Sequence, residues 1–241
     1  MIRRMIALSG ATLGIAALAV VAVVLPRAPG MAEGAARALP PPTLDVAPAG
    51  AGLQTAVFAG GCFWGVQGVF EHVKGVTQAV SGYTGGHVAN PGYELVSSGS
   101  TGHAESVRVT FDPARVSYGK LLQIFFSVAL DPTQVDGQGP DWGKQYRSEL
   151  FVTSPEQEHV ARAYLAQLQA AHVFNRTIAT RVDLAGAFYP AEGYHQDYLM
   201  RHPDAAYIAM YDIPQVQALQ ALFPQNWQDP PVTVLKPASG S

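Results

Sequence analysis

Short apolar runs alternate with segments of helical periodicity along most of this chain, and that alternation limits its fold more than any other feature. Four runs are rich in Val, Phe and other strand-forming residues: 55–61, 105–112, 147–154 and 178–185. Three segments instead repeat apolar residues every three or four positions: 62–73, 117–129 and 154–172. The two periods are typical of strands and helices. We therefore predict an α/β (α+β) single domain with one sheet backed by helices.

Two of the helices begin at recognisable capping residues. Ser117 precedes one of them, and Ser154 precedes the other, with Pro155 and Gln157 directly after it. A Ser hydroxyl at the N-cap accepts a hydrogen bond from a free backbone N–H, and Pro suits the first helical position. These residues predict that the helices start at 118 and 155.

The periodic pattern sets the limits of the folded domain at residues 52–223. Residues 27–51 are rich in Ala, Pro and Gly and have almost no large apolar side chains. Such a composition buries too little surface to fold, so this segment is predicted to be a linker. Residues 224–241 lose the periodicity and are predicted to be a C-terminal tail, lying on the domain or trailing free.

The first 26 residues have the pattern of an export segment. Arg3 and Arg4 precede Met5–Leu25, a run without charged residues. Its length lies between that of a signal-peptide core and that of a membrane-spanning helix. Residues 1–26 are therefore expected to be either a signal peptide or an N-terminal membrane anchor, with residues 5–25 as the tether. The rest of the chain is expected to be exported to the periplasm, membrane-anchored or soluble after cleavage.

Charge and cysteine content restrict the partners. The chain has 15 Lys and Arg against 18 Asp and Glu, a net charge of -3, and its folded part has no basic cluster. Nucleic acid is therefore not expected as a partner, because binding to phosphates needs concentrated basic residues. The single cysteine excludes an internal disulfide and any metal site built from several cysteines.

That single cysteine, Cys62, lies where a predicted strand passes through Gly60 and Gly61 into a predicted helix. A lone cysteine is by default an inert core residue. At the start of a helix, however, free N–H groups and the helix dipole stabilise an anion, which lowers the pKa of a thiol and makes it nucleophilic. The next residues, Phe63 and Trp64, cannot both face the interior from adjacent helical positions. One of them is expected beside the thiol at the surface.

Two glycine-rich segments carry further polar candidates. Residues 81–109 are expected to form a long polar loop that leads to Glu105 at the start of a strand. Partial burial there would keep the carboxyl protonated as an acid, although a solvated edge glutamate fits the pattern equally well. The second segment, residues 131–151, is expected to be an ordered loop that presents Asp141 and Tyr146.

These stretches together resemble a known family. In chain order they read "GCFWGVQ", "SGYTGG", "STGHAESVRV", "DPTQ", "QGPDWGKQYRS" and "YHQDYL", and they are similar to the motifs of the A-type peptide methionine sulfoxide reductases. The resemblance implies a peptide-methionine (S)-S-oxide reductase that repairs oxidised proteins, with residues 52–223 as its catalytic domain. It also implies a mixed sheet with a ferredoxin-like βαββα core and long wrapping loops.

The resemblance implies catalytic roles for five residues. Cys62 is expected to attack the sulfur of methionine S-sulfoxide, free or in proteins, and to become a sulfenic acid. Glu105 is expected to act as the acid on the sulfoxide oxygen. Tyr83 and Tyr146 are expected to bind that oxygen, because tyrosines in polar loops favour an exposed hydroxyl. Asp141 is expected to organise the site.

Other residues are expected to bind the substrate or support the site. Phe63 and Trp64 would hold the S-methyl group of the substrate, and Tyr194 would lie at the rim. His195, next to Tyr194, is expected to be structural. No metal and no organic cofactor are expected.

The sequence departs from the family in lacking a second cysteine. Ser97 stands where relatives often have a cysteine that resolves the sulfenic acid into a disulfide. Regeneration of Cys62 is therefore expected to need an external thiol reductant: a thioredoxin-like protein, a glutaredoxin or, in vitro, dithiothreitol.

Two other functions fit the same residues. One is a Cys–His hydrolase, in which His103 or His195 acts as the base for Cys62. The other is a thiol sensor without catalysis. The hydrolase predicts that replacing the histidine abolishes activity, whereas the reductase predicts that Glu105→Gln is damaging and that His195→Ala is mild.

Overall fold

The computed structural model describes residues 36–47 and 52–235. The expected export segment, residues 1–26 with its tether at 5–25, lies outside these ranges. So do the outer parts of the predicted linker and tail. Within the described ranges, none of the helices combines the length and the apolar character needed to cross a lipid bilayer.

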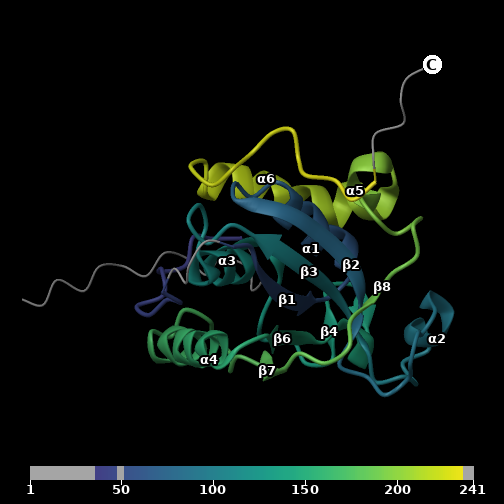
Figure 1. Ribbon diagram of the computed structural model, residues 1–241, viewed down its shortest axis with the longest axis horizontal. Coiled ribbons are helices and arrows are strands. Elements are labelled where there is room, and N and C mark those ends of the chain that lie inside the picture. The colour runs from purple at the N-terminus through teal and green to yellow at the C-terminus, as the bar shows by residue number, and fades with distance from the viewer. Residues whose placement is uncertain (1–35, 48–51, 236–241) are drawn as a thin grey trace, which may run out of the picture. The chain divides into compact units, whose positions relative to one another are not determined.

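A mixed sheet forms the centre of the described domain (Figure 1). Its strands run in the order β7-β6-β1-β3-β2-β8, and every neighbouring pair is antiparallel except β6 and β7. The strands are β1 (Gln54–Gly60), β2 (Val76–Thr84), β3 (Ala104–Phe111), β6 (Ser148–Val152), β7 (Arg181–Leu184) and β8 (Tyr189–Pro190). A separate ribbon pairs β4 (Gly137–Gln138) with β5 (Asp141–Trp142).

The connection from β1 to β2 gives the sheet its topology. Both strands are antiparallel to β3, which lies between them, so β1, α1 (Phe63–Glu71) and β2 form a split crossover. The later strand β6 pairs with the other edge of β1. This is the strand order of a ferredoxin-like core, which confirms the predicted α/β class and the mixed sheet.

The helices flank the sheet at different places. Besides α1, the helices are α2 (Tyr93–Ser97), α3 (Tyr118–Ile124), α4 (Pro155–Ala170), α5 (Tyr198–Arg201) and α6 (Ile213–Leu222). In Figure 1, α5 and α6 lie close to α1, whereas α4 lies beside β6 and β7. A π-helical turn follows α3 at Phe125–Ala129, another precedes α6 at Ile208–Asp212, and a 3-10 turn spans Lys144–Tyr146.

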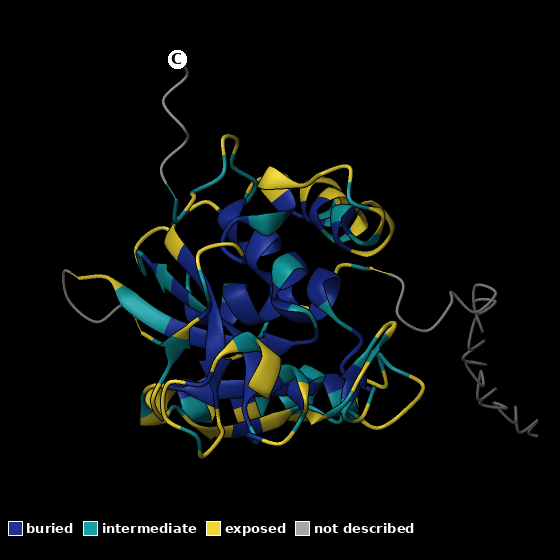
Figure 2. Ribbon diagram, turned by 90° about the vertical axis from the view of Figure 1, so that its right-hand side faces the viewer, coloured by how far each residue is buried: buried dark blue, intermediate teal, exposed yellow. Residues whose placement is uncertain are grey.

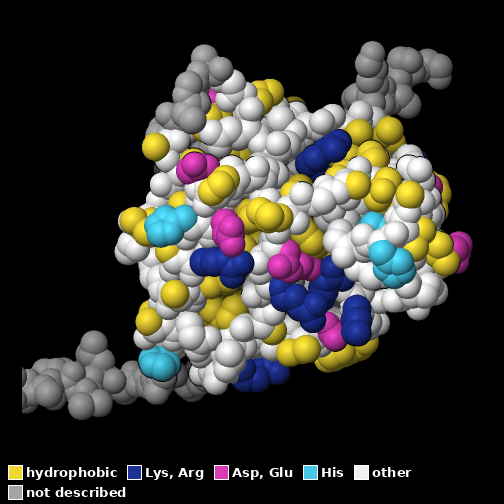
Figure 3. All heavy atoms as spheres, turned by 60° about the horizontal axis from the view of Figure 1, so that its bottom comes forward, with side chains coloured by type: hydrophobic (Ala, Val, Ile, Leu, Met, Phe, Trp, Pro, Cys, Tyr) yellow, Lys and Arg dark blue, Asp and Glu magenta, His cyan; other side chains and the backbone are white. Residues whose placement is uncertain are grey.

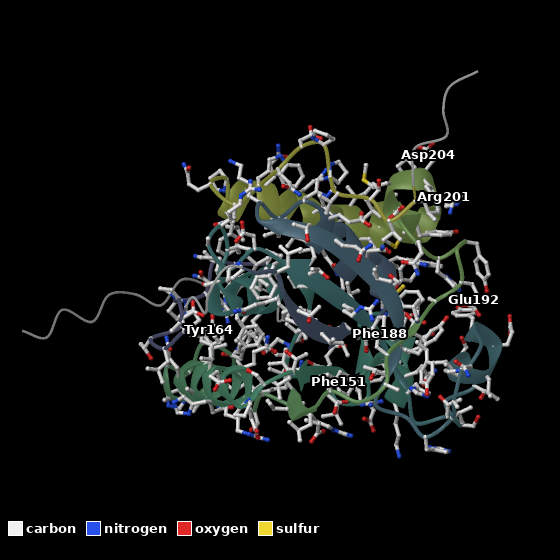
Figure 4. All side chains as sticks on the ribbon, in the orientation of Figure 1. Phe151, Tyr164, Phe188, Glu192, Arg201 and Asp204 are labelled. Carbon is white, nitrogen blue, oxygen red and sulfur yellow. The ribbon has the colours of Figure 1, made fainter. Side chains whose placement is uncertain are left out.

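Both faces of the sheet are covered, and Figure 2 shows the central elements as buried. On one face, Phe58 of β1 packs against Phe70 of α1 and Phe125, with ring centroids 4.6 and 5.1 Å apart. On the other face a smaller cluster includes Phe151, and the extended segment between β7 and β8 lays Phe188 against it (Figure 4). This segment is one of the expected wrapping loops.

The predicted helix starts are confirmed. The Ser117 hydroxyl accepts from the Lys120 backbone N–H at 3.2 Å, and α3 begins at Tyr118. The Ser154 hydroxyl accepts from the Gln157 backbone N–H at 3.2 Å, and α4 begins with Pro155. Local capping chemistry is therefore sufficient to fix these two boundaries.

The segment 81–109 differs from the predicted long loop. Its first residues complete β2, where Gly82 pairs with Ser106 and Tyr83 pairs with Glu105. Ser81 and Gly82 are small, so this end of the strand lacks the alternation of large apolar residues that identifies a strand in the sequence. A side chain at Gly82 would meet the Phe188 ring, because a Cβ there would lie 2.5 Å from a ring carbon.

Residues 36–47 lie inside the predicted linker, yet they pack on the domain. Leu39 is only 3% exposed, and its backbone N–H donates to Ser127 Oγ at 3.1 Å. The Asp45 carboxylate accepts from the Gly119 backbone N–H at 2.7 Å. The composition rules out a separate core for this segment, but one apolar side chain is enough to join an existing core.

The described part of the tail also lies on the domain. Trp227 forms a β-bridge with Val73, and the Val232 backbone N–H donates to the Glu71 carbonyl oxygen at 2.9 Å. The Leu235 backbone N–H donates to Asp197 Oδ2 at 2.7 Å. Of the two predicted arrangements, the structure has the one in which the tail, as far as residue 235, covers the fold.

Candidate active site

Cys62 stands at the turn between β1 and α1, as predicted. Gly61 before it has φ +91°, a conformation that favours glycine, and a Cβ there would lie 2.5 Å from Gln138 Cβ. Cys62 is the N-cap residue of α1, one position before the first helical turn, and is partly exposed. The tight turn thus fixes the thiol at the start of a helix.

Of the two aromatic residues after Cys62, one faces the interior and the other lies at the surface, as predicted. Phe63 is 1% exposed and belongs to the core, whereas Trp64 is half-buried at the surface. Trp64 stacks on Tyr198 with ring centroids 4.0 Å apart, and its indole N–H donates to His195 Nδ1 at 3.1 Å. These two contacts hold the indole beside the thiol.

Glu105 is buried at the start of β3, with 2% of its surface exposed. Its Oε2 accepts from the Phe63 backbone N–H at 3.0 Å. Burial raises the pKa of Glu105 to about 8, outweighing the effect of that hydrogen bond, and the Asp141 carboxylate also raises it. The carboxyl is therefore mainly protonated at neutral pH and can donate a proton.

The thiol itself differs from the prediction. Burial raises the pKa of Cys62 well above its ordinary value. At the high pH where this thiol would ionise, the negative charges of Glu105 and Asp212 raise that pKa further. The Trp64 backbone N–H acts in the opposite direction but is the smaller influence. A position at a helix start is therefore not enough to ionise this thiol, which must lose its proton during the reaction.

One cavity of about 140 Å³ brings these groups together, and we call it the aromatic pocket. It is lined by Cys62, Phe63, Trp64, Tyr93, Glu105, Asp141, Tyr146 and Tyr207. Aromatic rings make up most of its wall. The arrangement places one thiol and one protonated carboxyl in a small cavity whose other lining side chains are five aromatic residues and Asp141.

The loop 131–151 delivers its two predicted residues. Asp141 lies in β5, and Tyr146 ends the short 3-10 turn. The Tyr207 hydroxyl donates to Asp141 Oδ2, which ties the loop to the segment before α6. Burial raises the pKa values of both Tyr146 and Tyr207, so their hydroxyls remain hydrogen-bond donors.

The structure does not bring Tyr83 into the aromatic pocket. Tyr83 is fully buried in β2, and its hydroxyl donates to Glu192 Oε2 at 2.9 Å. Glu192 lies on the segment that follows β8, near α2 (Figure 4), and its Oε1 accepts from the Tyr93 backbone N–H at 2.9 Å. Tyr83 thus helps to hold α2, because its segment is a strand and not the expected loop.

Tyr194 is also outside the lining of the pocket. It is 55% exposed and packs on His195 with ring centroids 4.2 Å apart. His195 in turn contacts the ring of Tyr93 at 4.4 Å, so Tyr194 lies one ring away from the pocket.

Two lining residues, Tyr93 and Tyr207, were missing from the predicted site. Tyr93 follows a glycine in the same polar segment as Tyr83, and no local pattern separates the two tyrosines. Tyr207 lies in "AAYIAMY", a run that reads as ordinary helix. Only the register of β2 and the packing of the segment before α6 distinguish these residues.

Neither candidate histidine lines the aromatic pocket. The imidazole of His103 accepts from the Gly86 backbone N–H at its Nδ1, at 3.1 Å, and its Nε2 lies 2.8 Å from the Val88 carbonyl oxygen. His195 uses its Nδ1 as the acceptor for Trp64. The predicted structural role of His195 agrees with this contact. Neither histidine lines the aromatic pocket with Cys62, where a hydrolase would need its catalytic base.

Other kinds of site find no support in the described residues. No group of three or more His, Cys, Asp or Glu side chains among them could hold a metal ion. On the face shown in Figure 3, Lys and Arg side chains lie beside Asp and Glu and not apart from them. Such mixed charge differs from the basic stripe of a nucleic-acid-binding surface.

Comparisons with known proteins agree with the geometry. Residues 54–227 match the family described as peptide methionine sulfoxide reductase. Peptide methionine sulfoxide reductase MsrA 2 of Mesorhizobium japonicum is 53% identical over 184 residues, which cover 76% of this chain and 94% of that protein.

Two solved structures are also similar. The reduced form of Mxr1 from Saccharomyces cerevisiae has a TM-score of 0.57 and 30% identity, covering 64% of this chain and 87% of that one. Methionine sulfoxide reductase A of Corynebacterium diphtheriae has a TM-score of 0.55 and 34% identity, covering 63% of this chain and 76% of that one. Because the family match spans residues 54–227 and includes every residue of the aromatic pocket, this chain belongs to the peptide methionine sulfoxide reductase family.

Proposed function

We propose that this protein reduces methionine S-sulfoxide, free or in oxidised proteins, by transferring the sulfoxide oxygen to Cys62 with Glu105 as the acid. Reduction of methionine sulfoxide is the activity of the family to which the chain belongs. One observation carries the residue roles: the only cysteine of the chain shares a small aromatic pocket with a buried, protonated carboxyl.

The proposed step is balanced in protons and electrons. Glu105 donates its proton to the sulfoxide oxygen, which makes that oxygen a better leaving group, and the Cys62 thiol proton replaces it. The methionine sulfur gains two electrons as its S–O bond breaks. The sulfur of Cys62 loses two electrons as it takes the hydroxyl group. The products are methionine and Cys62 sulfenic acid.

The pocket wall supplies a reason for selecting one epimer. Tyr93 and Tyr146 supply phenol groups for the sulfoxide oxygen, and the Tyr207 hydroxyl holds Asp141. Phe63 and Trp64 offer apolar faces to the methyl group. With the oxygen and the methyl group fixed, only one configuration at sulfur directs the rest of the substrate out of the pocket. We assign this arrangement to the S epimer.

Removing single phenol hydroxyls tests the corrected tyrosine set. Tyr93→Phe and Tyr146→Phe should each slow methionine formation in a single turnover about 10-fold, the effect of one lost hydrogen bond of about 1.4 kcal/mol. Tyr83→Phe should change the rate less than about 3-fold, because its hydroxyl bonds to Glu192 outside the pocket. A larger loss for Tyr83→Phe than for Tyr93→Phe would contradict this assignment.

Stoichiometry tests the single-thiol scheme. Mixed with S-sulfoxide peptide and no reductant, the enzyme should form one equivalent of methionine, because only Cys62 can take the oxygen. Cys62→Ser should form none, and the R epimer should not react. A fast phase of two equivalents, measured by rapid quench and chromatography, would rule the scheme out.

The two alternative functions predict other results. Ester hydrolysis that disappears in His103→Ala would favour the hydrolase. Failure to form methionine with any added thiol would favour a sensor.

The sequence also supports a proposal about reductant and location. With one cysteine, the chain cannot close an internal disulfide, so an external thiol, such as a thioredoxin-like protein, a glutaredoxin or dithiothreitol, completes the cycle.

Arg3 and Arg4 before the apolar run of residues 5–25 support export to the periplasm, with or without a lasting membrane tether. Cell fractionation of the full-length chain tests the location.

A further inference from the structure

A second and larger cavity also reaches Cys62, and we call it the thiol cavity. Its volume is about 360 Å³, against about 140 Å³ for the aromatic pocket. Cys62 and Tyr207 line both cavities. The wall of the thiol cavity combines apolar side chains with five carboxyl and amide side chains: Asp131, Gln134, Gln138, Asp212 and Gln215. The two cavities therefore meet at Cys62, and amide side chains occur among the lining residues of the thiol cavity only.

Two oxygen atoms on the wall of the thiol cavity have no hydrogen-bond partner among the described residues. Asp212 is 2% exposed and its Oδ2 is unpaired, and the buried Oε1 of Gln215 is also unpaired. Both side chains face α1, since a Cβ at Gly65 would lie 2.6 Å from Asp212 Oδ1 and 2.7 Å from Gln215 Oε1. An unpaired buried polar atom costs about 1–3 kcal/mol, so a molecule in the cavity that donates a hydrogen bond to either oxygen would be stabilised.

The reduction of the sulfoxide does not use Asp212. That step already has its acid in Glu105, which lines the aromatic pocket and not the thiol cavity. The catalytic cycle nevertheless needs a second proton transfer at the same sulfur, when Cys62 sulfenic acid is reduced. Asp131, the other buried carboxyl on the wall, already pairs with Arg176 and accepts from the Thr133 hydroxyl. Asp212 is therefore the buried carboxyl that is left for this step.

We propose that the thiol cavity binds a low-molecular-weight thiol that reduces Cys62 sulfenic acid, and that Asp212 transfers the proton in that step. The proposal rests on the proposed function, which supplies the sulfenic acid. The cavity volume is within the range of about 300–1,000 Å³ that small-molecule sites occupy.

The step balances without another reactant. Asp212 as a carboxylate takes the proton of the incoming thiol, and the thiolate attacks the sulfur of Cys62. The S–O bond breaks, and Asp212 returns the proton to the departing hydroxide, which leaves as water. A mixed disulfide remains, and a second thiol molecule attacks its outer sulfur to release the Cys62 thiol and a small disulfide. The two thiol molecules supply the two electrons.

The wall chemistry also selects the kind of thiol. The unpaired atoms of Asp212 and Gln215 are acceptors, and no Lys or Arg occurs among the described residues that line the cavity. A thiol that carries an ammonium or N–H group fits this wall, whereas a thiol that carries a carboxylate is repelled. Burial, with the Asp141 carboxylate, raises the pKa of Asp212 to about 7, so both forms that a proton relay needs are present near neutral pH.

The regeneration step can be measured by itself. Cys62 sulfenic acid is made with one equivalent of S-sulfoxide peptide, and in parallel with hydrogen peroxide, so that the thiol step is tested whichever route works. Cysteamine or mercaptoacetate is then added, and mixed-disulfide formation is followed by quenched-flow mass spectrometry, with rates compared at equal concentrations of the protonated thiol. The wild-type rate should saturate with cysteamine, and mercaptoacetate should be at least about 10-fold less efficient, the value of 1.4 kcal/mol in binding.

Two variants and a matched control locate the effect. Asp212→Asn should slow the cysteamine step at least about 10-fold and remove the preference for the cationic thiol. Gln215→Leu should raise the half-saturating cysteamine concentration about 3- to 10-fold, through one lost hydrogen bond. Gln217→Leu changes an exposed glutamine on the same helix, outside the cavity wall, and should behave as wild type.

Two results would overturn the proposal. One is a cysteamine rate that rises linearly without saturation and is the same in Asp212→Asn, Gln215→Leu and Gln217→Leu. The other is a thioredoxin-like protein that reduces the sulfenic acid while both small thiols react only at their solution rates. Absence of methionine from the sulfoxide route, with normal cysteamine saturation after peroxide, would instead reject the proposed function alone.

Discussion

Replacing Glu105 with Gln is expected to slow methionine formation in a single turnover by about 10²- to 10⁴-fold, the usual contribution of a positioned general acid. The amide has nearly the same shape, and its carbonyl oxygen can still accept from the Phe63 backbone N–H, which the carboxyl binds at 3.0 Å. Only the transferable proton is lost. Rapid-quench kinetics with an S-sulfoxide peptide measures the effect directly.

The pH dependence identifies the proton that Glu105 supplies. Since the pKa of Glu105 is about 8, the wild-type rate should be level below that pH and fall about tenfold per pH unit above it. Glu105→Gln should lack this fall. Glu94→Gln, at an exposed position in α2, is the control and should keep both the rate and the profile. An unchanged alkaline fall in Glu105→Gln would show that another group supplies the proton.

Glu105→Gln lowers the catalytic rate, but at alkaline pH it should raise the free energy of unfolding. The carboxyl of Glu105 has a pKa of about 8 in the folded protein, above its ordinary value of 4.5, so ionisation is harder in the folded state. Stability is therefore fully present below pH 4.5 and is lost as pH rises towards 8. At pH 9, Glu105→Gln should be more stable than wild type in urea unfolding, and at pH 4 the difference should vanish.

Phe58→Ala is expected to lower the free energy of unfolding by about 3–5 kcal/mol, through lost burial and the cavity left behind. Phe58 is fully buried in β1, between the rings of Phe70 and Phe125. Small domains have only about 5–15 kcal/mol of stability in total. Urea unfolding followed by circular dichroism measures the change.

The control for this loss lies a few residues earlier on the chain. Leu53 is 60% exposed just before β1, and Leu53→Ala should stay within about 0.5 kcal/mol of wild type. Because β1 and α1 hold Cys62 between them, Phe58→Ala should also lose activity at temperatures where it remains partly folded. A destabilisation below about 1 kcal/mol would mean that Phe58 does not anchor the core.

The sequence predicted those parts of the fold that depend on neighbouring residues. Ser117 and Ser154 cap helices because their hydroxyls reach backbone N–H groups three residues ahead. The turn at Gly61 was predictable because a positive φ favours glycine. The strand pattern placed Glu105 at the start of β3 but left its burial open, and the resemblance to the family implied its role as the acid.

The errors occurred where the outcome depends on distant residues. Tyr83 and Tyr93 look alike in the sequence, but Tyr83 is turned away to Glu192 by the register between β2 and β3. Leu39 has no large apolar residue within four positions in the chain, yet it is buried in the core of the domain. In both cases the deciding contact lies far along the chain, so no local pattern records it.

The sequence by itself determined the fold class, the family, the position of the single thiol and the fact that this chain cannot close an internal disulfide. The tertiary structure alone decided which tyrosines share a pocket with that thiol, that its pKa is raised, and that Asp212 and Gln215 line a second cavity that also reaches Cys62. The reason is physical. A residue's own chemistry and its local turn are written in adjacent positions, whereas burial, electrostatic environment and cavity shape arise only when segments distant in the chain pack together.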